Sequence, residues 1–152
     1  MDNIEQLYQK LSNIDIIEFW RVEADFAGAL WRMPKKPLRA IAYLTIVNWL
    51  AMSVRQGVWT FYEAEGKDSN NIQSTVQYLK QSGEQELADI FVYGLHDYHN
   101  SQHGYGENQI LYPEEWIEEA LKIDNWISAH EEWLYQWERD LLIKNKDLLC
   151  LS

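Results

Sequence analysis

Apolar residues recur in steps of three and four along most of this chain, which is the spacing that places them on one face of an α-helix. Asp, Asn, Pro and Gly residues stand where this pattern is interrupted, as expected at helix ends. The pattern predicts helices over residues 4–11, 14–32, 37–56, 71–82 and 84–95, one opening at Pro113 and a last one over 124–144. The short run Val58 to Tyr62 has no partner strand, so we expect a further helical turn there.

The pattern therefore predicts an all-α fold, with a single compact domain of about seven or eight helices over residues 1–152. The helix over 37–56 is apolar on most sides, and we expect it to be central. Gly57 is expected to end this helix. In the last helix, we expect the buried stripe to consist of Trp126, His130, Trp133, Trp137 and Leu141.

Glu23 interrupts the apolar face of the helix over 14–32. A carboxylate that is buried in such a position needs a partner, because desolvating an unpaired charge is costly. Arg21, Arg32 or Arg39 could supply that partner, either as a structural ion pair or as the floor of a pocket.

Residues 99–112 show no periodicity and contain Gly104 and Gly106, so we expect a loop. Long loops in compact domains are often functional. Its aromatic residues, between Tyr98 and Tyr112, offer a candidate apolar interaction surface.

The sequence has no apolar run long enough for a membrane span and no secretion signal at its N-terminus. The single cysteine, Cys150, excludes an internal disulfide. A cytoplasmic location is the expectation that follows.

Acidic residues are concentrated in the C-terminal third of the chain. The net charge is −11, and residues 107–140 hold ten acidic side chains against Lys122 and Arg139. A negative field of this kind repels nucleic-acid phosphates and attracts basic surfaces. We therefore expect no direct binding to nucleic acid and a basic protein as the partner. The alternative is that the acids only keep a tryptophan-rich domain in solution.

Candidates for chemistry are few. His96, His99 and His103 could converge on a metal ion if one helix ran through all three, but Gly104 and Gly106 argue against such a helix and the spacing matches no standard zinc motif. Neighbouring glutamates such as Glu114 and Glu118 are typical of a solvated helix face. No phosphate-binding glycine loop is present, so we expect no enzymatic activity and no cofactor.

The middle of the chain resembles a known family. The residues that carry this resemblance are the run Gln56-Gly57-Val58-Trp59-Thr60-Phe61-Tyr62, then Gly66, Ser82-Gly83 and Ala88-Asp89-Ile90. They resemble a family of acidic bacterial helical domains typified by DNA mimic protein nineteen, and residues 123–145 are similar to its final helix. That family has asparagine at the place of Gln56 and glycine at that of Val58. The resemblance implies an all-helical, non-catalytic fold whose surface carboxylates imitate DNA phosphates and occupy the DNA site of a basic regulator.

The leading hypothesis is therefore an acidic interaction domain that antagonises a basic protein, such as a transcription regulator or a toxin. Local charge density selects the partner-binding residues Glu114, Glu115, Glu118, Glu119, Glu131, Glu132, Glu138 and Asp140. One alternative is an immunity-type or housekeeping module that binds through its aromatic surface, and another is a metal-dependent hydrolase that uses the three histidines. A homodimer is compatible with the first two hypotheses.

Overall fold

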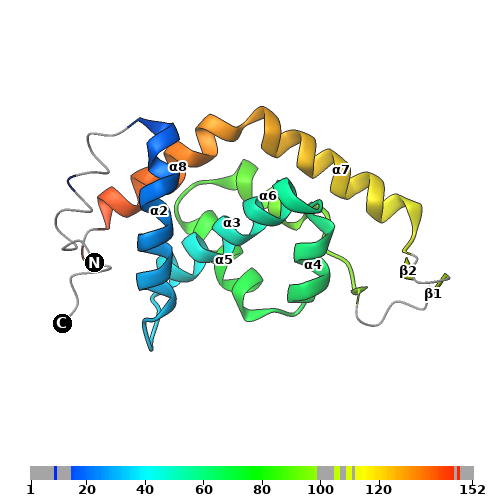
Figure 1. Ribbon diagram of the computed structural model, residues 1–152. Helices are drawn as coiled ribbons and strands as arrows, with labels where there is room; N and C mark the ends of the chain where they lie inside the picture. The colour runs from blue at the N-terminus through cyan, green and yellow to red at the C-terminus, as the bar shows by residue number, and fades with distance from the viewer. Residues whose placement is uncertain are drawn as a thin grey trace.

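The structure, a computed structural model, describes residue 9 and residues 15–98, 105–106, 109–110, 112–145 and 147. In this part of the chain, seven helices form one compact arrangement (Figure 1): α2 (Ile16–Trp31), α3 (Leu38–Arg55), α4 (Trp59–Glu65), α5 (Asn70–Gln81), α6 (Gln85–Tyr93), α7 (Glu114–Ala129) and α8 (Glu131–Lys144). The all-α prediction is confirmed. The helix predicted over 4–11 lies outside the described residues except for Gln9, which is helical.

A small hairpin interrupts the predicted loop between α6 and α7. The strands β1 (Tyr105–Gly106) and β2 (Gln109–Ile110) pair antiparallel, with Tyr105 opposite Ile110. None of the described helices is both long enough and apolar enough to cross a bilayer.

Helix α3 runs through the middle of the molecule (Figure 1), with α5 packed along it and α2, α4 and α7 against its other sides. Its buried residues include Tyr43, Ile46 and Trp49. The helix that is apolar on most sides is therefore central, as predicted, because each of its faces must be covered. It ends before Gly57, whose φ of 97° is a conformation that glycine adopts without strain.

The core has two parts. Trp49, Phe61, Tyr62 and Phe91 belong to the larger cluster, which lies among α3, α4, α5, α6 and α7. Within it the Tyr62 hydroxyl accepts a hydrogen bond from Trp49 Nε1 (2.9 Å) and donates one to the Phe91 carbonyl (2.6 Å). The smaller cluster fills the space between α2, α3 and α8, and its buried members are Phe19, Phe26, Leu30, Ala40, Tyr43, Leu141 and Leu142.

The boundary between the last two helices differs from the prediction. The helix that opens after Pro113 continues through Asp124 to Ala129, and the chain turns at His130. The sequence prediction starts the last helix at Asp124, but the Asp124 carboxylate forms hydrogen bonds with residues of α3 and of the segment before α4. It accepts hydrogen bonds from the Val58 backbone N–H (3.0 Å) and the Ser53 hydroxyl (2.5 Å), so it holds the start of α4 against α7.

The buried stripe of the last helix is also different. In α8 the buried residues are Leu134, Glu138, Leu141 and Leu142, whereas Trp133 is 43% exposed. The prediction that Trp133 lies in the core is therefore wrong. The packing of α8 against α2 and α3 decides which of its faces is covered. The covered face contains Leu134 and does not contain Trp133.

Candidate functional site: an acidic helix face and a carboxyl-lined groove

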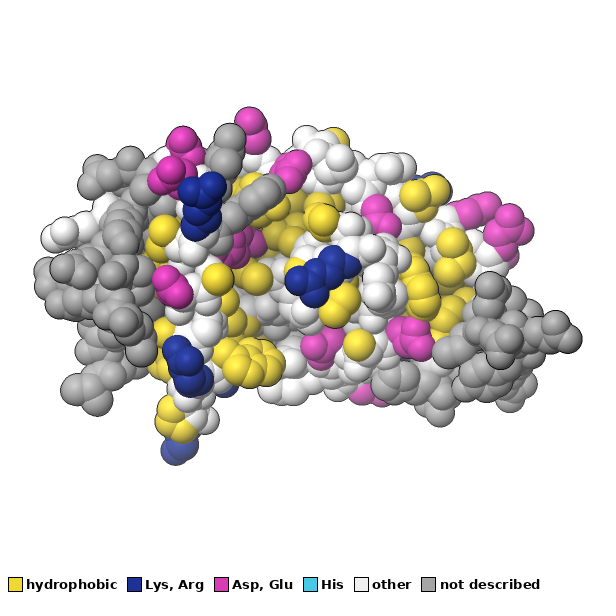
Figure 2. Space-filling model, in the orientation of Figure 1, with side chains coloured by type: hydrophobic (Ala, Val, Ile, Leu, Met, Phe, Trp, Pro, Cys, Tyr) yellow, Lys and Arg dark blue, Asp and Glu magenta, His cyan; other side chains and the backbone are white. Residues whose placement is uncertain are grey.

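Five of the eight predicted partner-binding carboxylates lie on the surface of α7 and the first turn of α8. Glu114, Glu115 and Glu118 are exposed on α7, and Glu131 and Glu132 are exposed on α8. Figure 2 shows acidic side chains at the right-hand end of the molecule, where α7 begins. The first two follow Pro113 in the first turn of α7, where the positive end of the helix dipole stabilises negative charge.

These exposed carboxylates are not neutralised by cations of the described chain. The ion pairs among the described residues include Arg39 with Asp147, Lys67 with Asp97, His96 with Glu119 and His130 with Glu86. Lys36, which is close to Arg39 in sequence, donates to the Met33 carbonyl and lies over the Trp31 ring. Arg39 and Lys36 are thus engaged elsewhere, and no described cation forms an ion pair with the exposed carboxylates of α7.

The other three predicted residues have different surroundings. Glu119 is half-buried and lies 2.5 Å from His96 Nε2. Asp140 accepts a hydrogen bond from Gln136 Nε2 (2.8 Å). Glu138 is only 1% exposed, so the prediction that its carboxylate lies on the exposed surface is wrong.

Glu138 belongs instead to a groove between α2, α3 and α8. This groove has a volume of about 520 Å³ and is lined by Glu23, Ala24, Ala27, Val47, Leu50, Ala51, Val54, Arg55, Glu131, Tyr135 and Glu138. It continues toward α7 along Leu50 and Val54, where Ser53, Asp124 and Ile127 line a second hollow of about 230 Å³. Figure 2 shows hydrophobic side chains gathered between α2 and α3 below the junction of α7 and α8.

Glu23 from α2 and Glu138 from α8 place their carboxyl groups together in this groove. Burial raises the pKa of Glu138 well above its usual range, and the negative charge of Glu23 raises it further. Burial also raises the pKa of Glu23, while hydrogen bonds with Glu138 and Tyr43 partly offset that effect. Two adjacent buried carboxyl groups do not both ionise easily, so the pair shares a proton.

The partner of Glu23 is therefore a second carboxyl group and not an arginine. Arg39 pairs with Asp147, and Arg21 and Arg32 are exposed. The sequence contains a signal for this pair, because Leu134, Glu138 and Leu141 fall at i, i+4 and i+7 on α8. The tryptophans at similar spacing form the stronger hydrophobic pattern. Of that predicted stripe, Leu141 is buried and Trp126 and Trp137 pack against the core, but Trp133 is exposed.

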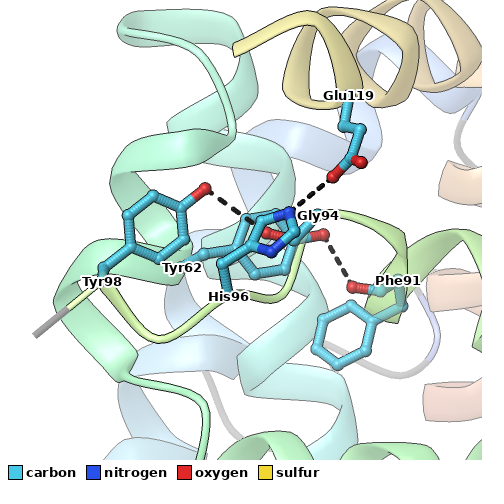
Figure 3. Close-up of polar contacts among 6 residues, drawn as sticks. All are labelled: Tyr62, Phe91, Gly94, His96, Tyr98 and Glu119. Atoms are coloured by element: carbon cyan, nitrogen blue, oxygen red, sulfur yellow. Dashed lines mark hydrogen bonds and ion pairs between the residues drawn. The ribbon is translucent and has the colours of Figure 1, made fainter. Parts of the chain in front are cut away.

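The histidine candidate for a metal site is part of an aromatic cluster. His96 stacks on Trp116 with ring centroids 4.4 Å apart, and its Nε2 lies against Glu119 of α7 (Figure 3). Tyr98 is buried and packs edge-on against Trp116 and Tyr112. His99 and His103 lie outside the described residues, and no group of three metal-ligating side chains occurs among the residues that the structure does describe.

Comparison with known proteins adds no assignment: no protein-family model, no curated protein and no solved structure matches the chain. The resemblance to the DNA mimic protein nineteen family stays a prediction from the sequence.

Proposed function

We propose that this protein is a non-catalytic interaction domain that binds a basic protein through the exposed carboxylates of α7 and the first turn of α8. One observation carries the proposal. Glu114, Glu115, Glu118 and Glu132 are exposed, and none of them forms an ion pair with a cation of the described chain. Unneutralised carboxylates on a rigid helix attract a positively charged surface and steer its approach.

The kind of partner follows from this charge. A protein that binds DNA or RNA presents lysine and arginine side chains to phosphates, and an acidic helix face can occupy the same side chains. A basic DNA-binding regulator, or a basic toxin domain that the protein would antagonise, fits this description. The competing interpretation assigns the glutamates only to helix stability and solubility, since acids in a first turn favour the helix dipole.

A charge-neutralising variant separates the two interpretations. A basic partner captured from cells that produce the protein would be purified and titrated with the native protein and with the triple variant E114Q/E115Q/E118Q. Three exposed charges at an interface together contribute roughly tenfold or more in affinity at low salt. We expect the triple variant to bind that much more weakly and to show a smaller dependence of affinity on salt.

The control is a second triple variant with the same change in net charge. Glu18, Asp25 and Asp68 are exposed acids outside α7 and α8, and E18Q/D25N/D68N should bind like the native protein. Equal weakening by both variants would indicate a general effect of net charge. Undiminished binding by E114Q/E115Q/E118Q, or retention of the partner at high salt, would contradict the proposal.

A further inference from the structure

The groove between α2, α3 and α8 combines aliphatic walls with an acidic floor. Ala24 and Ala27 of α2 face Val47 and Ala51 of α3 across a volume of about 520 Å³. Small side chains on both walls leave this space open, and the hollow is visible between the two helices in Figure 2. Concave apolar sites with a few convergent polar groups are typical of ligand-binding sites.

The floor of the groove has few hydrogen-bond donors. Both carboxyl oxygens of Glu138 are buried, and apart from the proton that Glu138 shares with Glu23, no donor of a described residue reaches them. Glu23 is 8% exposed and lies beside it. One proton cannot satisfy the oxygens of two buried carboxyl groups, and buried oxygens without donors are rare in folded proteins and cost stability. Their position at the floor of a groove indicates a place for a donor from outside.

Charged and titratable groups face this floor from three helices. They are Glu23 of α2, Tyr43 and Arg55 of α3, and Glu131, Tyr135 and Glu138 of α8. Asp124 of α7 lines the adjoining hollow. Arg55 is exposed, and no ion pair joins it to a carboxylate of the described residues. Among these residues the carboxyl groups outnumber the one guanidinium, and the groove is complementary to a cation.

We propose that this groove binds a lysine side chain of a partner protein, with its ammonium group between Glu23 and Glu138 and its methylene stem against the alanines of α2 and α3. An ammonium group has three N–H donors in a compact head, which suits the two adjacent carboxyl groups. Its aliphatic stem gains from apolar walls. A guanidinium is a broader planar fork that prefers a single carboxylate in a bidentate arrangement. The site is separate from the exposed face of α7 and shares only Glu131 with the first turn of α8, so it does not rest on the function proposed above.

Binding of the ammonium group changes the protonation of the carboxyl pair. In the free protein the carboxyl pair holds a proton, because burial raises the pKa of both Glu23 and Glu138. The ammonium group takes the place of this proton, which is released to solvent as both carboxylates ionise. Affinity should therefore rise with pH over the range in which the free pair still holds its proton.

The test uses the full chain and hexalysine amide as the probe, with Nε-acetylated hexalysine and hexaarginine as comparisons. Calorimetric titrations in two buffers of different ionisation enthalpy measure both affinity and proton release. We expect hexalysine to bind with release of protons and with an affinity that increases with pH. Acetylated hexalysine, which lacks the ammonium charge, should not bind, and hexaarginine should bind without the same proton release.

Two variants connect this behaviour to the groove. E138Q should weaken hexalysine binding at least about tenfold and abolish the proton release. A51L fills the groove and leaves both carboxyl groups in place, so it should also block binding without removing a titrating group. E114Q/E115Q/E118Q should keep the proton release even if the total affinity falls. Native-like proton release in A51L or in E138Q would overturn the proposal. The proposal would also fail if the native protein did not bind hexalysine, or if hexaarginine released as many protons as hexalysine.

Discussion

Glu23 on α2 and Glu138 on α8 bury their carboxyl groups against each other, although they come from opposite ends of the chain. The contact lies at the floor of an open groove and beside the smaller core cluster. Two adjacent buried carboxyl groups destabilise a fold unless they share a proton or receive a cation. This pair therefore makes stability depend on pH in a direction that is unusual for acidic residues.

Stability should fall as pH rises. The usual pKa of a glutamate is 4.5, and both folded-state pKa values are raised above it. Above pH 4.5 the unfolded chain gives up protons that the native state retains. The free energy of unfolding should thus decrease as pH rises from about 4.5 through the folded pKa, with a slope of up to about 1.4 kcal/mol per pH unit for one proton. Urea denaturation from pH 4.5 to 8.5 measures this slope.

The E138Q variant isolates the contribution of the pair. It should flatten the dependence on pH and stabilise the protein by about 1–2 kcal/mol at pH 8, because it removes a buried acid and can donate to Glu23. E132Q, at an exposed position of the same helix, should keep the native slope. Identical slopes in E138Q and the native protein would show that the pair does not govern the titration.

Tyr62 should be a strong contributor to the larger core cluster. Its buried hydroxyl connects Trp49 Nε1 to the Phe91 carbonyl. The Y62F variant leaves both of these buried groups without their partner, so we expect a loss of about 1–3 kcal/mol in the free energy of unfolding. Y93F, at a tyrosine that is 44% exposed, serves as the control and should change stability little. Urea denaturation at one pH compares the two.

A side chain at Gly94 should destabilise the fold. An added Cβ would lie 2.8 Å from Ile123 Cδ1 and 3.0 Å from Tyr62 Cε2, because α7 and α4 approach the end of α6 closely. G94A should therefore cost about 1–3 kcal/mol through overpacking. In α2, G28A meets nothing nearer than Arg32 at 3.8 Å and should stabilise the helix by about 0.5–1 kcal/mol. Thermal unfolding of the two variants should show shifts of opposite sign.

Asp124 should anchor the start of α4. The D124A variant removes the acceptor for the Val58 N–H and the Ser53 hydroxyl, and a loss of about 1–2 kcal/mol is expected. D124N keeps an acceptor oxygen at this position and should retain most of the stability. If D124A and D124N were equally destabilised, the negative charge would be the stabilising feature and not the pair of hydrogen bonds.

Local patterns were sufficient to predict most of the helices. The all-round apolar character of residues 37–56 predicts a central helix, and Gly57 and Pro113 mark helix ends in the structure as expected. These features depend on neighbouring residues along one helix and on backbone preferences of single residues. The exposed positions of Glu114, Glu115 and Glu118 follow in the same way, from their place in the first turns of a helix.

The sequence by itself therefore determined the helical class, the central helix and the acidic character of α7. Only the tertiary structure decided that Asp124 anchors α4, that Trp133 is exposed, and that Glu23 meets Glu138 rather than an arginine. Each of these depends on which distant segments pack together. Periodicity along one helix shows that a face is buried, but the neighbour that covers that face is set by the packing of the whole chain.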